Sequence, residues 1–393
     1  MLQKIFNFEL LSKVISGKNS IKKVNFFLKD KNFKKIGLII DKNLYKSSVY
    51  VKTFSKKIKN KKIIFFDGNN EPTYTNLDTE VRKIKKSQNI FDCLVAIGGG
   101  STIDFAKGIA TMLKNPGKSI NYRGFPKNLK LSIPIIAVPS TAGTGSELAY
   151  NAVFTDTKSQ KKLGINTKNN YPILSILDPL VLINSPRSVI LNSSLGALIR
   201  SFDTMFNKKS TKISKIFSEN SFKLVFNNFS KILKNKKNIE AWSDMQWGSY
   251  LSVAALLNSS SGPAGNISYY LSVKNNIPQG LGYAVAGINF IKRNHEKGYY
   301  EYSKFFDLIE KKLVKNNLSK KEKSFYVINS VFKILKNNIL FFNKKIANEK
   351  QKKNISILMY QEIKNATKNN PINLDQKDLS IIIDRILNTF KKK

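Results

Sequence analysis

The sequence predicts an α/β domain built on a parallel sheet, followed by an all-α domain. In the first half, short apolar runs bounded by turn residues alternate with helical patterns, which is the signature of a parallel sheet flanked by helices. After Pro186, long helical stretches replace these runs. Between the two regions, Asp178-Pro179 and Ser185-Pro186 interrupt the chain direction. We therefore expect one domain over residues 1–182 and a second over residues 183–393.

The individual elements follow from the same patterns. Five apolar runs are expected to form strands, at residues 36–40, 63–66, 93–97, 133–138 and 173–177. Between these runs, helices are expected at residues 78–86 and 101–114. In the second half we expect helices at residues 188–206, 213–233, 241–257, 319–338 and 354–367, with a Ser/Gly loop at residues 258–266.

The composition limits the chemistry that the chain can perform. Its 393 residues are 41% hydrophobic, so two domains of ordinary size can each bury a core. Cys93 is the only cysteine and His295 the only histidine. This excludes a disulfide and any metal site that needs several Cys or His ligands. We expect His295 to be a surface residue of the Lys/Glu-rich segment around it.

Charge and hydropathy bear on the location and the partners of the protein. The N-terminal segment lacks the continuous apolar region of a signal peptide, and no window approaches a run of about 20 apolar residues. We therefore expect a cytoplasmic protein. The net charge of +41 invites a nucleic-acid or anionic-membrane hypothesis. Because lysines are spread from Lys4 to Lys393, beside abundant Asn, Ile, Phe and Tyr, we favour an AT-rich coding bias and expect neither partner.

A run of three glycines is the strongest local signal for a ligand. Gly98, Gly99 and Gly100 follow an apolar strand and open an amphipathic helix. Glycines let backbone N–H groups approach an anion closely, and the helix N-terminus adds the positive end of its dipole. This pattern predicts a phosphate cradle. The alternative is that Ser101 and Asp104 form a capping box that merely starts the helix.

A second polar loop and an acidic strand end strengthen the nucleotide hypothesis. Residues 139–147, PSTAGTGSE, again follow an apolar strand. Ligands of open α/β sheets bind beyond the carboxyl ends of the strands, so we expect the two loops to converge on one crevice. Asp41 closes the first predicted strand. It could accept hydrogen bonds from an adenine ribose, which favours NAD over NADP, or it could be a simple turn residue.

Several stretches together resemble the iron-containing alcohol dehydrogenase family. They are GGGSTIDFAKGIA at 98–110, AVPSTAGTGSE at 137–147, KKLGI at 161–165 and ILDP at 176–179. The resemblance implies a Rossmann-like N-terminal domain and a helical C-terminal domain, as in dehydroquinate synthase-like proteins. It also implies a cleft where NAD(P) meets an alcohol or aldehyde, and a homo-oligomer.

Within that family the chain looks similar to the branch acting on sugar acids, of the 3-deoxy-octulosonate 8-oxidase type. The matching stretches are EPTYTNL at 71–77, MLKNPGKSINYRGF at 112–125, KKLGINT at 161–167 and ISYYLS at 267–272. This second resemblance implies a role in carbohydrate biosynthesis and a polar, sugar-derived substrate.

Carried over by position, the resemblance implies a set of nucleotide contacts that are all present. They are Asp41, Gly98, Gly99, Gly100, Ser101, Thr102, Asp104, Ser140, Thr141, Thr144, Ser146 and Lys162. Lys162 follows a short strand-like segment and is expected to place a cation near the cofactor ribose. The family's metal ligands, an aspartate and three histidines, fall instead on Gly196, Arg200, Gly265 or Asn266, and Gln279. We therefore expect no bound metal.

Without a metal, another group must stabilise the alkoxide that hydride transfer creates or consumes. Arg200 is the candidate, because its permanent charge occupies a ligand position. Asp203, Tyr269 or Tyr270 would move the proton, and Asp203 would need a pKa raised by burial. Alternatively, Arg200 pairs with Asp203 and fills the space of a lost metal, and the tyrosines are core aromatics.

Two hypotheses for the function remain. The first is a metal-independent NAD(P)-linked oxidoreductase that acts on a small polar alcohol or aldehyde. The second is a catalytically degenerate relative that serves as a nucleotide-binding or partner subunit. The intact cofactor loops favour the first hypothesis, whereas the replacement of every metal ligand favours the second.

Overall fold

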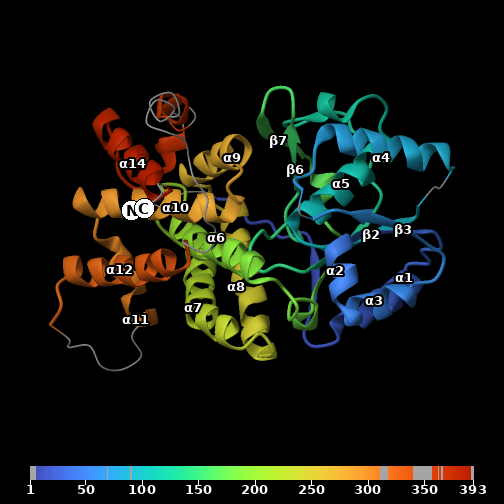
Figure 1. Ribbon diagram of the computed structural model, residues 1–393, viewed down its shortest axis with the longest axis horizontal. Coiled ribbons are helices and arrows are strands. Elements are labelled where there is room, and N and C mark those ends of the chain that lie inside the picture. The colour runs from blue at the N-terminus through green and yellow to red at the C-terminus, as the bar shows by residue number, and fades with distance from the viewer. Residues whose placement is uncertain are drawn as a thin grey trace. The chain divides into compact units, whose positions relative to one another are not determined.

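A computed structural model describes residues 6–68, 70–88, 91–309, 317–339, 356–361, 363 and 366–390 (Figure 1). The described residues form two compact units. The first, the α/β unit, comprises Leu10–Pro186 and Lys231–Gln246. The second, the helical unit, comprises Arg187–Ser230, the described residues after Gln246, and those up to Glu9. The predicted fold class, a parallel-sheet α/β domain followed by a helical domain, is confirmed.

The α/β unit is built on a six-stranded sheet in the order β1-β8-β5-β4-β2-β3, with every neighbouring pair parallel. The strands are β1 (Lys13–Ser16), β2 (Ile36–Asp41), β3 (Lys61–Phe66), β4 (Cys93–Gly98), β5 (Ile135–Pro139) and β8 (Leu174–Leu177). All five predicted strands are present. The sequence did not predict β1, because this edge strand is short and exposes Lys13 and Ser16.

Helices cover both faces of this sheet. Figure 1 shows α4 (Tyr74–Lys86) and α5 (Gly100–Lys114) on one face, and α1 (Lys23–Asp30), α2 (Lys42–Ser47) and α3 (Val49–Lys56) on the other. Both predicted helices are present. The N-terminus of α4 lies upstream of the predicted residue 78, because the Thr73 hydroxyl caps it by accepting from the Asn76 N–H.

A small antiparallel hairpin packs on α5 and was not predicted. Its strands are β6 (Asn151–Asp156) and β7 (Lys161–Asn166). Gly108 allows the close approach, because a Cβ there would lie 2.5 Å from the Phe154 ring. The hairpin, α4, α5 and the sheet share one apolar core.

The helical unit contains long helices, as predicted. They are α6 (Arg187–Phe206), α7 (Lys212–Lys234), α8 (Ile239–Leu257), α9 (Ala264–Asn275), α10 (Gln279–Glu296), α12 (Lys320–Ile339) and α14 (Gln376–Thr389), and α11 (Phe306–Ile309) is a single short turn. The contacts assign residues 231–246, from the end of α7 and the start of α8, to the α/β unit. The sequence missed α9 and α10, whose segments are rich in Gly, Ser and Asn. The predicted helix at 354–367 lies partly outside the described residues, which are helical at 356–361.

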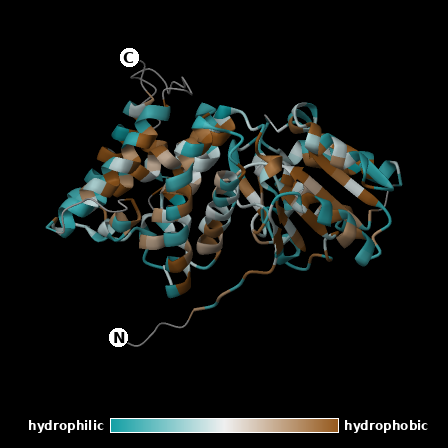
Figure 2. Cartoon of the chain, turned by 90° about the horizontal axis from the view of Figure 1, so that it is seen from below, coloured by the Kyte–Doolittle hydropathy of each residue, from teal (hydrophilic) through white to brown (hydrophobic). Residues whose placement is uncertain are grey.

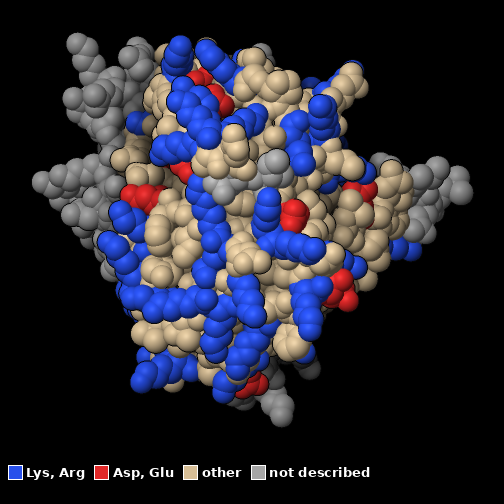
Figure 3. Space-filling view, turned by 90° about the vertical axis from the view of Figure 1, so that its right-hand side faces the viewer, with Lys and Arg blue, Asp and Glu red and all other residues tan. Residues whose placement is uncertain are grey.

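The distribution of polar and charged side chains fits two globular units. Figure 2 shows hydrophobic residues on the strands and on inward helix faces, and hydrophilic residues on outward faces. Among the described residues, no helix is both long and apolar enough to cross a membrane. On the face drawn in Figure 3, lysines and arginines are spread widely rather than gathered in a single stripe.

Candidate functional site

The two predicted ligand loops begin side by side in the α/β unit. Strands β4 and β5 pair in parallel with Gly98 opposite Pro139, and the Ser140 N–H donates to the Gly98 carbonyl at 2.9 Å. A Cβ on Gly99 would lie 3.3 Å from Thr141, and one on Gly100 would lie 2.6 Å from the Thr144 hydroxyl. The expected convergence of the loops is confirmed, and Gly100 has no room for a larger residue.

The helix after the glycines begins without a side-chain cap. Gly99 is the N-cap of α5, and no side chain accepts from its first turn. The capping-box alternative is therefore wrong, because Ser101 lies inside the helix. Asp104 is buried and instead accepts from the Val153 N–H of the hairpin at 3.0 Å. The N–H groups that a capping side chain would satisfy remain at the mouth of the loop, as a phosphate cradle requires.

Two hydroxyl groups at the cradle support a ligand there. The side-chain oxygens of Thr102 and Thr141 are buried, and neither has a hydrogen-bond partner within the described residues. Leaving a buried hydroxyl unpaired costs about 1–3 kcal/mol, so such groups usually have a function. Ser140 and Ser146 are also buried, and Thr144 is exposed at the loop surface. This set of donors and glycines fits the phosphates of a dinucleotide.

Asp41 lies where the sequence predicted, at the carboxyl end of β2, and it also caps α2. Its Oδ1 accepts from the Leu44 N–H at 2.8 Å. Burial raises the pKa of its carboxyl group, and the nearby Asp67 carboxylate raises it further, against the lowering effect of the backbone hydrogen bonds. Gly68 permits this packing, because a Cβ there would lie 1.7 Å from Asp41 Oδ2. Both hypotheses for Asp41, ribose acceptor and turn residue, are compatible with this position.

Lys162 differs from the sequence expectation in its setting. It does not follow a strand but lies within β7. Its ammonium group is buried and forms an ion pair with Glu71 at 2.8 Å, whereas the Glu71 side chain is 45% exposed. The charge of Lys162 is therefore partly neutralised by Glu71.

Beneath the cradle, a buried lysine joins α5 to the hairpin. Lys107 Nζ donates to the carbonyl oxygens of Ala149 and Asn151, at 2.8 and 2.9 Å, and lies 3.6 Å from Asp104 Oδ1. Ala149 lies two residues after the second ligand loop in the sequence. Lys107 and Asp104 therefore fix the position of that loop relative to α5, and neither was assigned this role from the sequence.

In the helical unit, Arg200 and Asp203 of α6 meet a residue that the sequence did not reveal. Arg200 Nη1 donates to the Ser252 hydroxyl at 3.0 Å, and its guanidinium lies 5.7 Å from the centre of the Tyr283 ring. The Tyr283 hydroxyl donates to Asp203 Oδ2. The only available signal for Tyr283 was a lone tyrosine within the small-residue stretch LGYAVAG.

Burial controls the protonation of this cluster. It raises the pKa of Asp203 to about 6, although Tyr283, the Gly262 N–H and the Arg200 charge all lower it. Burial also raises the pKa of Tyr283, so that its hydroxyl stays protonated. Tyr269 of α9 is half-buried and near enough for its charge to act on Tyr283. The three predicted catalytic residues therefore gather around Tyr283, with a carboxyl group that can exchange protons near neutral pH.

Close backbone packing surrounds two of the positions onto which the resemblance places the family's metal ligands. A Cβ on Gly196 would lie 3.2 Å from the Gly280 Cα, and one on Gly280 would lie 2.0 Å from the Asn192 carbonyl oxygen. Helices α6 and α10 thus meet backbone to backbone beside two of these positions. Among the described residues, no group of three His, Cys, Asp or Glu side chains could hold a metal.

The single histidine lies elsewhere in the helical unit. His295 Nδ1 is 2.9 Å from the Ser324 hydroxyl, and its ring contacts Tyr300 and Phe325. His295 is partly buried where α10 packs against α12, so the expectation of a surface residue is met only in part.

Comparisons with known proteins agree with this architecture. The family described as "Iron-containing alcohol dehydrogenase" matches residues 12–179, and the one described as "Fe-containing alcohol dehydrogenase family, C-terminal" matches residues 190–387. Alcohol dehydrogenase 4 of Schizosaccharomyces pombe is 30% identical over 68% of this chain and 64% of its own length. The NAD-dependent methanol dehydrogenase of Bacillus methanolicus is 28% identical over 67% of this chain and 69% of its own length.

Solved structures share the fold over nearly the whole chain. A 1,3-propanediol oxidoreductase has a TM-score of 0.86 at 21% identity and covers 98% of this chain and 100% of its own. Sulfoacetaldehyde reductase from Bifidobacterium kashiwanohense, in complex with NAD+, has a TM-score of 0.83 at 20% identity and covers 98% and 99%. Some curated relatives align over less than two thirds of their own length, as the Schizosaccharomyces protein does at 64%. From the family matches and the fold, the chain belongs to the iron-containing alcohol dehydrogenase family.

Proposed function

We propose that the protein is a metal-independent, NAD-linked oxidoreductase that acts on a small polar alcohol or aldehyde. The observation that carries this proposal is a contrast between the two units. The phosphate cradle keeps its glycines and two buried hydroxyls without partners among the described residues, whereas the metal-ligand positions hold Gly, Arg, Asn and Gln. A bound nicotinamide nucleotide would accept or supply the hydride.

The residues of the cradle would bind and orient the nucleotide. The first-turn N–H groups of α5 and the hydroxyls of Thr102 and Thr141 would donate to its phosphates. Asp41 would accept from the adenine ribose. Because the charge of Asp67 acts on Asp41, two carboxylates would repel a 2′-phosphate at this position. This arrangement supports NAD over NADP.

The cluster in the helical unit would supply the electrostatic and proton chemistry. Arg200 would stabilise the negative charge on the substrate oxygen. In metal-dependent enzymes the metal ion does this and contributes several kcal/mol. In the oxidation direction, the Tyr269 oxygen would take the alcohol proton as the Tyr269 hydroxyl releases its own proton to the Asp203 carboxylate, whose pKa of about 6 suits proton exchange near neutrality. Tyr283 would hold the Asp203 carboxylate through its hydrogen bond.

The substrate class, location and assembly are part of the same proposal. Similarity of the stretches at 71–77, 112–125, 161–167 and 267–272 to the sugar-acid branch supports a sugar-derived substrate and a role in carbohydrate biosynthesis. The sulfoacetaldehyde reductase from Bifidobacterium kashiwanohense, which shares the fold, is named for a polar aldehyde. We propose a cytoplasmic homo-oligomer whose functional domains are residues 1–182 and 183–393.

A second candidate function is that of a catalytically degenerate, nucleotide-binding partner subunit. The observation in its favour is that Arg200 already donates to Ser252 and lies beside Tyr283, as a residue filling a lost metal site would. In that case the cradle would bind NAD(H) and no substrate would be turned over.

Steady-state kinetics with a matched pair of variants separate the two functions. Chelator-treated, metal-analysed protein is assayed for NADH oxidation against a panel of small and sugar-derived aldehydes. We expect turnover, a loss of about 100-fold in kcat/KM for Arg200→Gln, and no change for Arg187→Gln, an exposed position on the same helix. Turnover that requires added iron or zinc would refute the metal-free mechanism. NADH binding without turnover of any aldehyde would favour the partner subunit.

A further inference from the structure

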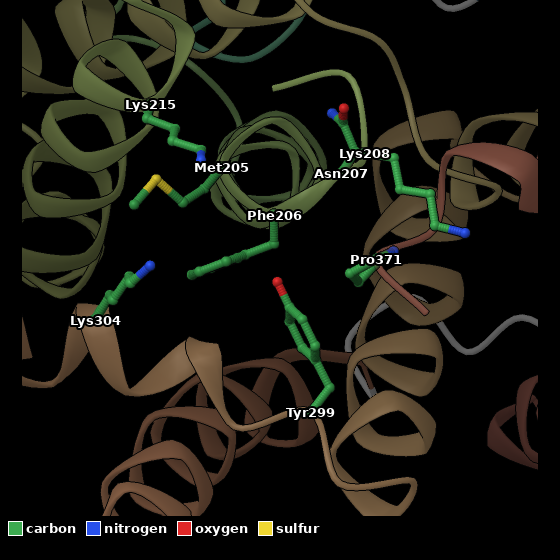
Figure 4. A pocket seen from close by; sticks show the side chains of 8 residues that line it. All are labelled: Met205, Phe206, Asn207, Lys208, Lys215, Tyr299, Lys304 and Pro371. Carbon is green, nitrogen blue, oxygen red and sulfur yellow. The ribbon is translucent and has the colours of Figure 1, made fainter. Parts of the chain in front are cut away.

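The helical unit contains a pocket that the proposed oxidoreductase chemistry does not use. Its volume is about 230 Å³ (Figure 4). It lies beside the last turn of α6, the first turn of α7 and the segment that follows α10. The lining residues are Met205, Phe206, Asn207, Lys208, Lys215, Tyr299, Lys304 and Pro371. Three of these eight residues are lysines and none is acidic.

The charge of this lining is only partly compensated. Lys304 forms an ion pair with Glu301 at 2.8 Å, but Glu301 is shared with Lys320. Lys208 donates to the neutral amide of Asn373 at 2.6 Å. Within the part of the chain that the structure describes, the Lys215 ammonium group has no hydrogen-bond or ion-pair partner. Counting only the described residues, one carboxylate therefore faces four ammonium groups, and an anion would gain from entering.

The apolar side of the pocket is firmly held. Phe206 packs edge-on against the rings of Tyr299, Tyr302 and Phe305, with centroids 6.4, 4.9 and 5.2 Å away. Figure 4 shows Lys215 and Lys304 on the same side of Phe206, with the Tyr299 hydroxyl directed toward that ring. Burial raises the pKa of Tyr299 to about 12, so its hydroxyl is protonated and can donate. The pocket thus joins two cations and a hydroxyl donor to an aromatic wall.

We propose that this pocket binds a small organic anion, a phosphate or carboxylate carried on a compact apolar body. The anionic group would lie between Lys215 and Lys304, and the body against Phe206 and Met205. A volume of 230 Å³ equals that of about eight water molecules at about 30 Å³ each, which suits a ligand of this size rather than a dinucleotide. All the lining residues belong to the helical unit, whereas the phosphate cradle belongs to the α/β unit. The site is therefore additional to the nucleotide site.

Calorimetric titration of the full chain with phenyl phosphate and with inorganic phosphate, in about 0.15 M salt to screen surface charge, tests this site. The key variant is Lys215→Gln/Lys304→Gln. Its matched control is Lys212→Gln/Lys223→Gln, which removes the same charge from exposed positions of α7. We expect saturable binding of phenyl phosphate, about threefold or more tighter than that of inorganic phosphate. The key variant should weaken it about tenfold, and the control should leave it unchanged.

Three outcomes would overturn the proposal. The first is binding that does not saturate. The second is an equal loss of affinity in both double variants, which would indicate nonspecific attraction by surface charge. The third is unchanged affinity in the key variant, which would indicate that phenyl phosphate binds in the cradle. Melting temperatures are compared first. If the key variant melts early, Lys215→Gln alone is used, because this exposed side chain has no partner to lose. That single variant should still weaken binding about threefold.

Discussion

Replacing Gly280 by alanine should destabilise the helical unit strongly. A Cβ at this position would lie 2.0 Å from the Asn192 carbonyl oxygen and 2.9 Å from its carbon, both of which are backbone atoms of α6. Side-chain rotation cannot relieve that overlap, so α6 and α10 would have to separate. The shift would also weaken the hydrogen bond from the Leu281 N–H to Asn192 Oδ1, which is 2.9 Å long.

The magnitude follows from these contacts. Overpacking of a tight core costs about 1–3 kcal/mol, and a backbone overlap belongs at the upper end. Alanine gains up to about 1 kcal/mol over glycine in a helix, which offsets part of the loss. A net cost of about 2–3 kcal/mol corresponds to a melting temperature about 4–12 °C lower for a unit of this size.

Gly265→Ala is the matched control for a thermal-melting assay. Gly265 occupies the same second position of its helix, α9, but a Cβ there would lie 3.7 Å from the nearest atom, an ordinary contact. We expect the melting temperature of this control to stay the same or to rise. Equal melting temperatures for the two variants would refute the close packing of α6 on α10 beside Gly196.

Three further predictions concern charged side chains. Lys107→Met should lower the free energy of unfolding in urea by about 3–5 kcal/mol, because two carbonyl oxygens lose their donor and Asp104 stays buried without its cation. Adding Asp104→Asn to this variant should restore part of the loss. No recovery in the double variant would contradict the pairing of Lys107 with Asp104. The pKa of Asp203 is about 6 in the folded chain, against about 4 in an unfolded chain. Between these pH values only the folded state keeps the Asp203 carboxyl protonated. The free energy of unfolding should therefore fall as the pH rises from about 4 to about 6. Asp203→Asn should remove this fall, and an unchanged pH profile would refute the raised pKa. Asp41→Asn should improve NADP binding relative to NAD about tenfold in fluorescence titrations, with a smaller gain for Asp67→Asn; an unaltered ratio would show that Asp41 does not select the cofactor.

The parallel sheet could be predicted because its inner strands β2, β4, β5 and β8 are buried and therefore have nearly continuous apolar sequences. Every residue of β4 is buried, for example. Strand β1 escaped detection because its exposed ends are polar. The hairpin escaped it because β6 and β7 are only partly buried and β7 begins with two lysines. Helices α9 and α10 were missed because they pack through glycines, which lower helix propensity in a sequence but allow close contact in a fold.

The candidate site, like the fold, could be predicted from the sequence only in part. The convergence of the two loops could be predicted, since neighbouring parallel strands end at one edge of a sheet. The role of Asp104 could not, because a local S-x-x-D pattern does not reveal that the hairpin would offer the Val153 N–H to its carboxylate. Tyr283 lies 80 residues from Asp203 in the sequence, and only the packing of α10 on α6 brings them together.

A fluorescence titration with NADH, on protein shown by elemental analysis to contain no iron or zinc, tests whether the cradle binds the nucleotide without a metal. We expect saturable binding with enhanced nicotinamide fluorescence, unchanged by a chelator, and weaker binding for Gly100→Leu, whose side chain would collide with Thr144. Absence of binding in the metal-free protein, or binding that appears only after iron or zinc is added, would contradict this expectation.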